Sequence, residues 1–264
     1  MRISTSVLKT LAVGAMGALA LTGCGSSETP AASSSSDPNA VTVLNTGKLT
    51  VCSDIPYEPF EFVKGGKNVG FDMDIAAEIA KDLSLELNVI DSSFDSIESG
   101  LFRTQCDIAI SSLSITDARK ANMDFSTPYM DDDLTLIAKD GSGVTDIESA
   151  KGKKVGVQQA TTGAKYAKDN GVDAIGYEDS GLQIASLKAG TTVATLGNQS
   201  VLAYAIKDDP TFKRVADFKT GEKLGIAVPK GGTVMLEKVS TTLKRLTDDG
   251  SLAKFQETWF GATN

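Results

Sequence analysis

The sequence predicts an α/β protein built from two consecutive units, each with a parallel sheet covered by helices. Short runs rich in aliphatic and β-branched residues alternate with segments of helical periodicity. This alternation occurs between residues 49 and 110 and again between residues 154 and 207. A repeated strand–helix–strand order is typical of parallel sheets flanked by helices.

The first unit is predicted to contain three strands and two helices. Its strands cover residues 49–52, 85–90 and 106–110. A helix capped by Asp72 is expected after the first strand, because Ile75 and Ile79 then lie on one face. A shorter helix covers residues 95–101, and the apolar third strand is expected to be buried.

The second unit repeats this order. Strands at 154–157, 174–177 and 193–196 alternate with helices at 161–170, 182–189 and 200–207. An apolar run over residues 134–138 lies between the two units, and residues 224–228 form a further strand. Two helices end the chain. The first has an apolar stripe through Leu243, and the second ends in Trp259 and Phe260, which are predicted to anchor it.

The N-terminus has the features of a secretory signal. Its apolar run, residues 11–21, is shorter than the ~20 residues that span a bilayer. An ordinary N-terminal membrane anchor is the alternative. The tetrapeptide Leu21-Thr22-Gly23-Cys24 resembles the bacterial lipobox, whose cysteine becomes the first mature residue and carries the lipid. We therefore expect a signal peptide over 1–23, then a lipidated Cys24 and a flexible tether over 24–40 that holds the protein at the outer face of the cell membrane.

Composition excludes several classes of function. The formal net charge is −8 and the pI is about 4.7, whereas nucleic-acid binding requires clustered Lys and Arg. Histidine is absent from the sequence, so serine triads and the usual zinc sites are excluded. The Walker phosphate loop is also missing. We expect no catalytic residues, no metal and no cofactor.

Two cysteines remain besides Cys24. They are Cys52 and Cys106, on the first and third predicted strands of the first unit. In an exported chain a remaining pair favours a disulfide, and two buried free thiols are the alternative.

Polar side chains are concentrated directly after the predicted strands. Ligands of open parallel sheets lie beyond the carboxyl ends of the strands, so these segments are candidates for a site. They are residues 53–60, 91–94, 111–119, 158–163 and 197–199. Together they supply many hydroxyls, aromatic rings, carboxylates and an arginine, which suits a small polar ligand.

These segments resemble the bacterial extracellular solute-binding proteins of family 3, the amino-acid-binding components of ABC importers. The resemblance runs from about Lys48 to Gly261. It rests on YEPFEF at 57–62, VGFDMDIA at 69–76, SITDAR at 114–119, DFSTPY at 124–129, KGKKVGV at 151–157 and WFG at 259–261. The resemblance implies a type II periplasmic-binding-protein fold. Lobe 1 would cover 41–131 plus 224–264 and lobe 2 would cover 132–223, with a two-strand hinge near 129–133 and 220–224.

Within this resemblance, one group of residues is expected to hold a ligand carboxylate. The planar fork of Arg119 fits a carboxylate bidentately, and Ser112 and Ser114 offer donors beside it. A surface arginine is the alternative. Thr161 and Thr162 lie at a helix start, where free N–H groups favour an anion. Simple capping is the alternative there.

A second group is expected to surround the rest of the ligand. Tyr57 and Phe94 would enclose its aliphatic or cationic part, with core packing as the alternative. Asp54 would pair with a ligand cation or cap a turn. Gln158 would point toward the distal group, and Ser111 toward the wall or an amine.

Asn198 departs from the family pattern. The resemblance places there an aspartate that binds the ligand's α-ammonium, and an amide supplies no charge for that contact. Either Asp54 compensates, or the ligand has no ordinary α-ammonium.

The predicted function is to bind a polar amino acid or a related small carboxylate and deliver it to the permease of an ABC importer. Two alternatives remain open. One is a dehydratase-like enzyme on the same fold, for which Asp54 is the candidate acid. The other is a protein that binds a zwitterion other than an amino acid.

Overall fold

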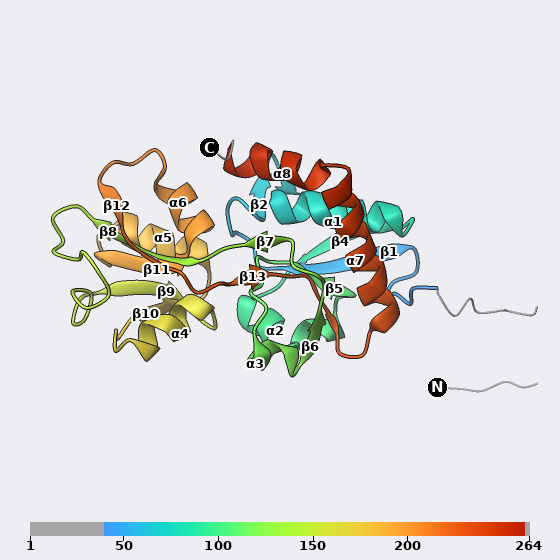
Figure 1. Cartoon of the computed structure of the whole chain (residues 1–264), viewed down its shortest axis with the longest axis horizontal. Helices are drawn as coiled ribbons and strands as arrows, with labels where there is room; N and C mark the ends of the chain where they lie inside the picture. The colour runs from blue at the N-terminus through green and yellow to red at the C-terminus, as the bar shows by residue number, and fades with distance from the viewer. Residues whose placement is uncertain (1–39, 262–264) are drawn as a thin grey trace, which may run out of the picture. The chain divides into compact units, whose positions relative to one another are not determined.

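The computed structural model describes residues 40–261. The predicted signal peptide, Cys24 and the tether up to residue 39 lie outside the described residues. Two five-stranded sheets, ordered β4-β1-β5-β14-β6 and β10-β9-β11-β8-β12, define a first and a second lobe. Helices cover both faces of each sheet (Figure 1), so the α/β class is confirmed. Within residues 40–261, no helix is long and apolar enough to cross a bilayer.

The first sheet contains the three predicted strands at its parallel edge. Strand β1 (Lys48–Ser53) pairs in parallel with β4 (Glu86–Asp91) and with β5 (Ile108–Ala109). Strand β14 (Ala227–Pro229) pairs antiparallel with β5 and with β6 (Met123–Phe125), so the sheet is mixed. The antiparallel order follows because β14 returns to this sheet after the chain has passed through the second lobe.

The helices of the first lobe lie on opposite faces of its sheet (Figure 1). Helices α1 (Phe71–Asp82), α7 (Thr233–Asp248) and α8 (Ser251–Phe260) share one face, and α2 (Phe94–Glu98) lies on the other. The Nε1 of Trp259 donates a 2.7 Å hydrogen bond to Asp74, and Phe260 packs against Phe60 and Phe71. The predicted aromatic anchor is therefore confirmed. The smaller elements are β2 (Phe62–Lys64), β3 (Lys67–Val69), a 3-10 helix (Leu101–Thr104) and α3 (Asp117–Lys120).

The predicted capping role of Asp72 is wrong. The N-cap of helix α1 is Gly70, two residues before Asp72, at φ +136°. A Cβ at Gly70 would lie 2.1 Å from the carbonyl oxygen of Phe60, so this close approach of two backbone segments requires glycine. Asp72 consequently lies inside the first turn with its carboxylate buried. One oxygen of that carboxylate accepts hydrogen bonds from Ser112 N (2.7 Å) and the hydroxyl of Tyr129 (3.1 Å).

The second sheet also combines predicted parallel strands with antiparallel ones. Strand β9 (Val155–Gln158) pairs in parallel with β10 (Ile175–Tyr177) and β11 (Ala194–Asn198). The apolar run forms β8 (Leu134–Lys139), which pairs antiparallel with β11 and with β12 (Phe212–Phe218). Strand β12 is not predicted, because it lies at the sheet edge and its polar residues obscure the pattern. The helices are α4 (Thr162–Asp169), α5 (Ser180–Lys188) and α6 (Gln199–Ile206).

Two short strands connect the lobes (Figure 1). Strand β7 (Met130–Asp131) pairs antiparallel with β13 (Lys223–Leu224). The strand expected over 224–228 is therefore divided into β13 and β14, because Leu224 pairs with Met130 whereas Ala227 joins the first sheet. Gly225 lies at the division, where an added Cβ would come within 2.8 Å of the Ile115 side chain.

A disulfide joins Cys52 on β1 to Cys106, just before β5, and their Cα atoms are 5.7 Å apart. Both cysteines are buried. The predicted disulfide is confirmed, and it crosslinks two neighbouring segments of the first sheet.

Candidate ligand-binding site

The predicted site residues meet where the carboxyl ends of β1 and β9 approach each other. Three hydrogen bonds join the lobes there: Gln158 Nε2 to Asp54 Oδ2 (2.6 Å), the Tyr57 hydroxyl to Asn198 Oδ1 (3.2 Å) and Ser180 Oγ to the carbonyl of Pro56 (2.8 Å). The first two bonds are made entirely by predicted site residues. The strand ends therefore form one polar interface, as expected for α/β sheets.

Arg119 lies in α3 and is only 4% exposed, so it is not the surface arginine of the alternative. Its Nη1 donates to the carbonyl of Ser114 (2.9 Å) and its Nη2 to that of Ala160 (3.1 Å), which belongs to the second lobe. The guanidinium carbon Cζ lies over Phe94, 5.1 Å from the centre of the ring. The Nε of Arg119 is 3.7 Å from a Glu98 carboxylate oxygen. Burial lowers the pKa of Arg119, and the charge of Glu98 opposes that shift. A buried, oriented cation therefore lies at the lobe interface.

The hydroxyls of Ser114 and Thr162 converge on one carboxylate oxygen. Ser114 Oγ donates to Glu222 Oε2 at 2.6 Å, and Thr162 Oγ1 donates to the same atom at 2.7 Å. Ser114 follows β5 in the first lobe, Thr162 begins α4 in the second, and Glu222 directly precedes β13. Sequence reasoning missed Glu222, since a Thr-Gly-Glu-Lys segment is typical of a solvated turn and only the β7–β13 pairing brings it here.

Thr161 has the capping role. Its hydroxyl oxygen accepts from the backbone N–H of Ala164 (3.1 Å) and donates to the carbonyl of Gln158 (2.8 Å). The hydroxyl is thus used within the second lobe, and Thr162 is the threonine whose side chain faces the first lobe.

Ser111 and Ser112 have different surroundings. The Ser111 hydroxyl donates to Glu61 and accepts from the backbone N–H of Asp54, so Ser111 faces the wall of the site. Ser112 adopts φ +45°, and its backbone N–H is taken by Asp72. Its buried hydroxyl has no hydrogen-bond partner among residues 40–261, which leaves it available to a ligand.

Two buried carboxyls, Glu61 and Asp72, lie directly behind these serines. Desolvation and their mutual proximity raise the pKa of Glu61 well above its ordinary value, and burial raises the pKa of Asp72 to about 7. Two of their buried oxygen atoms, Glu61 Oε2 and Asp72 Oδ1, have no hydrogen-bond partner in the described part of the chain. A proton held between the two carboxyls satisfies both atoms and removes the cost of two adjacent buried charges. Sequence reasoning did not identify this pair.

Further acids surround the Tyr57 hydroxyl. Its pKa is raised well above the ordinary value by burial and by the nearby charges of Asp132, Glu61, Asp54 and Glu222. Burial also raises the pKa of Asp54 to about 7, against the opposing effect of its bond from Gln158, and raises that of Asp132 to about 7. Asn198 Nδ2 donates to the carbonyl of Asp132 at 3.2 Å. The region around Asn198 is therefore acidic although residue 198 itself is neutral.

The space around Tyr57, Gln158 and Asn198 is small. A cavity of about 10 Å³ is lined by Tyr57, Gln158, Asn198 and neighbouring residues of the second lobe. That volume is close to the room one water molecule needs. A second cavity, of about 600 Å³, is lined by Arg119, Thr161 and Thr162, so the predicted carboxylate end of the site adjoins a larger space.

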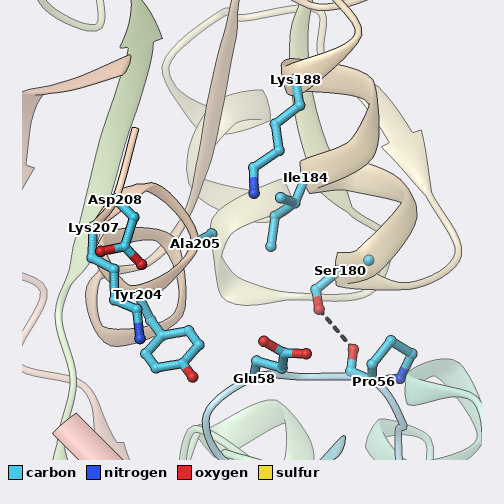
Figure 2. A pocket seen from close by; sticks show the side chains of 10 residues that line it. Pro56, Glu58, Ser180, Ile184, Lys188, Tyr204, Ala205, Lys207 and Asp208 are labelled. Atoms are coloured by element: carbon cyan, nitrogen blue, oxygen red, sulfur yellow. Dashed lines mark hydrogen bonds between the residues drawn. The ribbon is translucent and has the colours of Figure 1, made fainter. Parts of the chain in front are cut away.

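A larger pocket of about 380 Å³ lies at the rim, outside this site. Figure 2 shows Pro56 and Glu58 on one side of it, with Ser180, Lys188 and Tyr204 on the helices opposite. Predicted site residues are absent from its lining. This pocket therefore lies outside the predicted site, whose oriented polar groups come from both lobes.

Comparison with known proteins agrees with this geometry. The model of the family "Bacterial extracellular solute-binding proteins, family 3" matches residues 49–262. The L-cystine-binding protein TcyJ of Escherichia coli is 30% identical over 226 residues, which cover 83% of this chain and 85% of that protein. The structure of an ancestral arginine-binding protein bound to glutamine matches with a TM-score of 0.77 at 34% identity, covering 83% of this chain and 100% of that one. ArtJ, the arginine-, lysine-, histidine-binding protein from Geobacillus stearothermophilus, matches with a TM-score of 0.76 at 29% identity, covering 82% and 96% of the two chains.

The family match extends over nearly all of the described residues and includes both lobes. The predicted type II fold is confirmed by the similar solved structures. The family consists of solute-binding proteins and not of enzymes, so the dehydratase alternative is not supported. This chain belongs to the bacterial extracellular solute-binding proteins of family 3.

Proposed function

We propose that the protein is the extracytoplasmic substrate-binding component of an ABC importer and that it carries an amino acid to the permease. The observation that carries the proposal is the convergence of the Ser114 and Thr162 hydroxyls on one carboxylate oxygen between the lobes, with the buried guanidinium of Arg119 bonded to the Ser114 carbonyl. The named relatives bind cystine, arginine, lysine, histidine or glutamine, which supports an amino acid as the class of ligand.

The ligand carboxylate would bind Arg119 together with the hydroxyls of Ser112, Ser114 and Thr162. A guanidinium has five N–H donors, and each terminal nitrogen of Arg119 uses one of its two in the bonds to backbone carbonyls. One N–H therefore remains on each terminal nitrogen for a carboxylate. This arrangement supports the carboxylate role without disturbing the bonds that orient the side chain.

The remainder of the ligand would lie between Tyr57 and Phe94. Asp54 would take its ammonium, because that carboxyl already lies at the lobe interface. Gln158 would contact the distal group, since its Oε1 is buried and has no partner among the described residues. The pKa of Asp54 is raised to about 7, and only the ionised carboxylate attracts a cation strongly. The contact between Asp54 and the ligand ammonium should therefore strengthen as the pH rises through about 7.

We propose that lobe 1 covers 41–131 plus 224–264, that lobe 2 covers 132–223, and that the lobes move about β7 and β13. The hydrogen bonds that cross between the lobes, including that from Arg119 to Ala160, support a closed conformation that opens for ligand entry. Opening at the connecting strands would leave both sheets intact.

A screen of the protein amino acids and cystine tests the function. Thermal unfolding is measured with each compound, and hits are titrated by calorimetry. A ligand at 100 times its Kd stabilises the folded state by about 2.7 kcal/mol, a shift that thermal unfolding detects. Binding of a betaine or another zwitterion, with no response to any amino acid, would favour the alternative class of ligand.

Replacing Asn198 with aspartate is expected to tighten the binding of an ordinary amino acid severalfold. Hydrogen bonds to charged groups contribute ~1.5–3 kcal/mol against ~1 kcal/mol for neutral ones, so a carboxylate should hold the α-ammonium better than the amide does. Calorimetric titration of Asn198→Asp measures the change. The control is Asn68→Asp on the exposed hairpin, which adds the same charge away from the site. Weaker binding would mean that the ligand presents no ammonium to residue 198.

The lipid anchor is proposed from the sequence alone, because Cys24 lies outside the described residues. Its basis is the Leu21-Thr22-Gly23-Cys24 motif and the Ser-rich segment that follows. In Cys24→Ser cells the protein is expected in the soluble fraction or as an uncleaved precursor. Membrane fractionation with immunoblotting distinguishes this from normal retention at the membrane, which would rule out the anchor.

A further inference from the structure

Glu222 lies where the proposed function places the carboxylate of the ligand. Its Oε2 accepts one hydroxyl hydrogen bond from each lobe, from Ser114 at 2.6 Å and from Thr162 at 2.7 Å. The negative charge of Glu222 also acts on the buried guanidinium of Arg119. Two hydroxyl donors and a cation are the groups that the proposed site offers to a solute carboxylate.

The backbone of Glu222 ties this side chain to the connecting strands. Its carbonyl accepts from the N–H of Asp132 at 3.1 Å, and the next residue begins β13. The carboxylate therefore bridges the lobes from a position beside the hinge. A solute carboxylate that takes the same donors must displace it or approach it as a like charge.

We propose that Glu222 is an internal competitor of the ligand carboxylate and that it determines both affinity and selectivity. The inference rests on the proposed function, because it assumes that the solute carboxylate binds Arg119, Ser114 and Thr162. Glu222 acts as a substitute carboxylate that keeps these donors satisfied. A solute binds only as far as its own carboxylate outcompetes Glu222.

The competition has a specific consequence for selectivity. An amino acid loses affinity because Glu222 holds the donors it needs and repels its carboxylate. An amine formed from the same amino acid by removal of the carboxyl group has no such conflict, because Glu222 can remain in place. Neutralising Glu222 should therefore favour the amino acid over its amine.

The test is calorimetry of Glu222→Gln against the wild type with a panel of the protein amino acids and cystine. The Gln amide oxygen can still accept a hydroxyl bond, but neutral bonds are weaker than charge-assisted ones and the repulsion is removed. For every amino acid that binds the wild type, we expect affinity to rise about tenfold, which corresponds to about 1.4 kcal/mol. The matching decarboxylated amine, agmatine in the case of arginine, should gain no affinity.

Two further variants separate this effect from other changes. Asp248→Asn removes a negative charge from α7, where Asp248 pairs with the exposed Lys244 far from the hinge, and should leave affinity unchanged. Glu222→Asp keeps the charge but shortens the side chain, so its affinity should lie between those of the wild type and Glu222→Gln.

The outcomes distinguish the two proposals. Amino-acid binding that is unchanged or weakened in Glu222→Gln, or an equal gain for the amine, would overturn the competitor role and leave the proposed function standing. An absence of amino-acid binding by both proteins would overturn the proposed function and the inference with it.

Discussion

Replacing Arg119 with alanine is expected to weaken the binding of the amino acid by roughly 30-fold to several-thousand-fold, because truncating one partner of a buried charge pair costs about 2–5 kcal/mol. The substitution removes the bidentate fork and the Coulomb attraction together. It also leaves Glu98 and Glu222 without their cation, so the emptied site would repel a second carboxylate. Calorimetric titration measures the loss of affinity.

Two controls accompany this variant. Arg119→Lys keeps the positive charge but cannot reproduce the planar fork, so its affinity should lie between those of the wild type and Arg119→Ala. Arg214→Ala removes an exposed arginine of β12 that pairs with Asp217, and it should bind normally. Wild-type affinity in a folded Arg119→Ala protein would move the carboxylate site elsewhere.

Removing the disulfide is expected to lower the free energy of unfolding by ~2–4 kcal/mol. Cys52 and Cys106 are separated by 54 residues, a segment that includes β4, α1 and α2, so the crosslink strongly restricts the unfolded chain. Alanine is the suitable replacement at both positions, because both side chains are buried and a hydroxyl would lack a partner.

Chemical denaturation of Cys52→Ala/Cys106→Ala beside the oxidised wild type measures this effect. Reduced wild-type protein is the matched control, because it loses the crosslink without losing the sulfur atoms. A double variant as stable as the oxidised protein would show that the disulfide adds nothing to stability. Ligand affinity is measured alongside, because both cysteines pack in one apolar cluster with Phe94, over whose ring the Arg119 guanidinium lies.

The buried acids around the candidate site favour a ligand that carries a positive charge. Burial raises the pKa of Asp54 and of Asp132 to about 7, and it raises the pKa of Glu61 well above its ordinary value. Each of these shifts reflects a carboxyl that would gain from a nearby cation. A ligand ammonium supplies one, which reconciles an amide at residue 198 with a site for an amino acid.

Much of the fold could be predicted because it follows from local patterns. Alternation of β-rich and helical segments identifies β1, β9, β11 and most of the helices, since side-chain periodicity is a property of each segment alone. The same logic predicted much of the candidate site: Arg119, Tyr57, Gln158 and Asn198 all follow predicted strands. Parallel strands bring their carboxyl ends to one edge, so residues distant in sequence become neighbours by topology.

What the tertiary structure decided depends on contacts between segments that carry no local signal. Gly70 and the Phe60 backbone meet closely, and this moves the start of α1 and turns Asp72 from an expected cap into a buried partner of Glu61. The sequence around Glu222 is typical of a turn. Only the β7–β13 pairing places this residue between the lobes. The sequence by itself determined the fold class, the disulfide and the strand-end residues. Only the packed structure determined which carboxylates share the site, because a side chain's partners depend on long-range approach and not on the spacing of its neighbours.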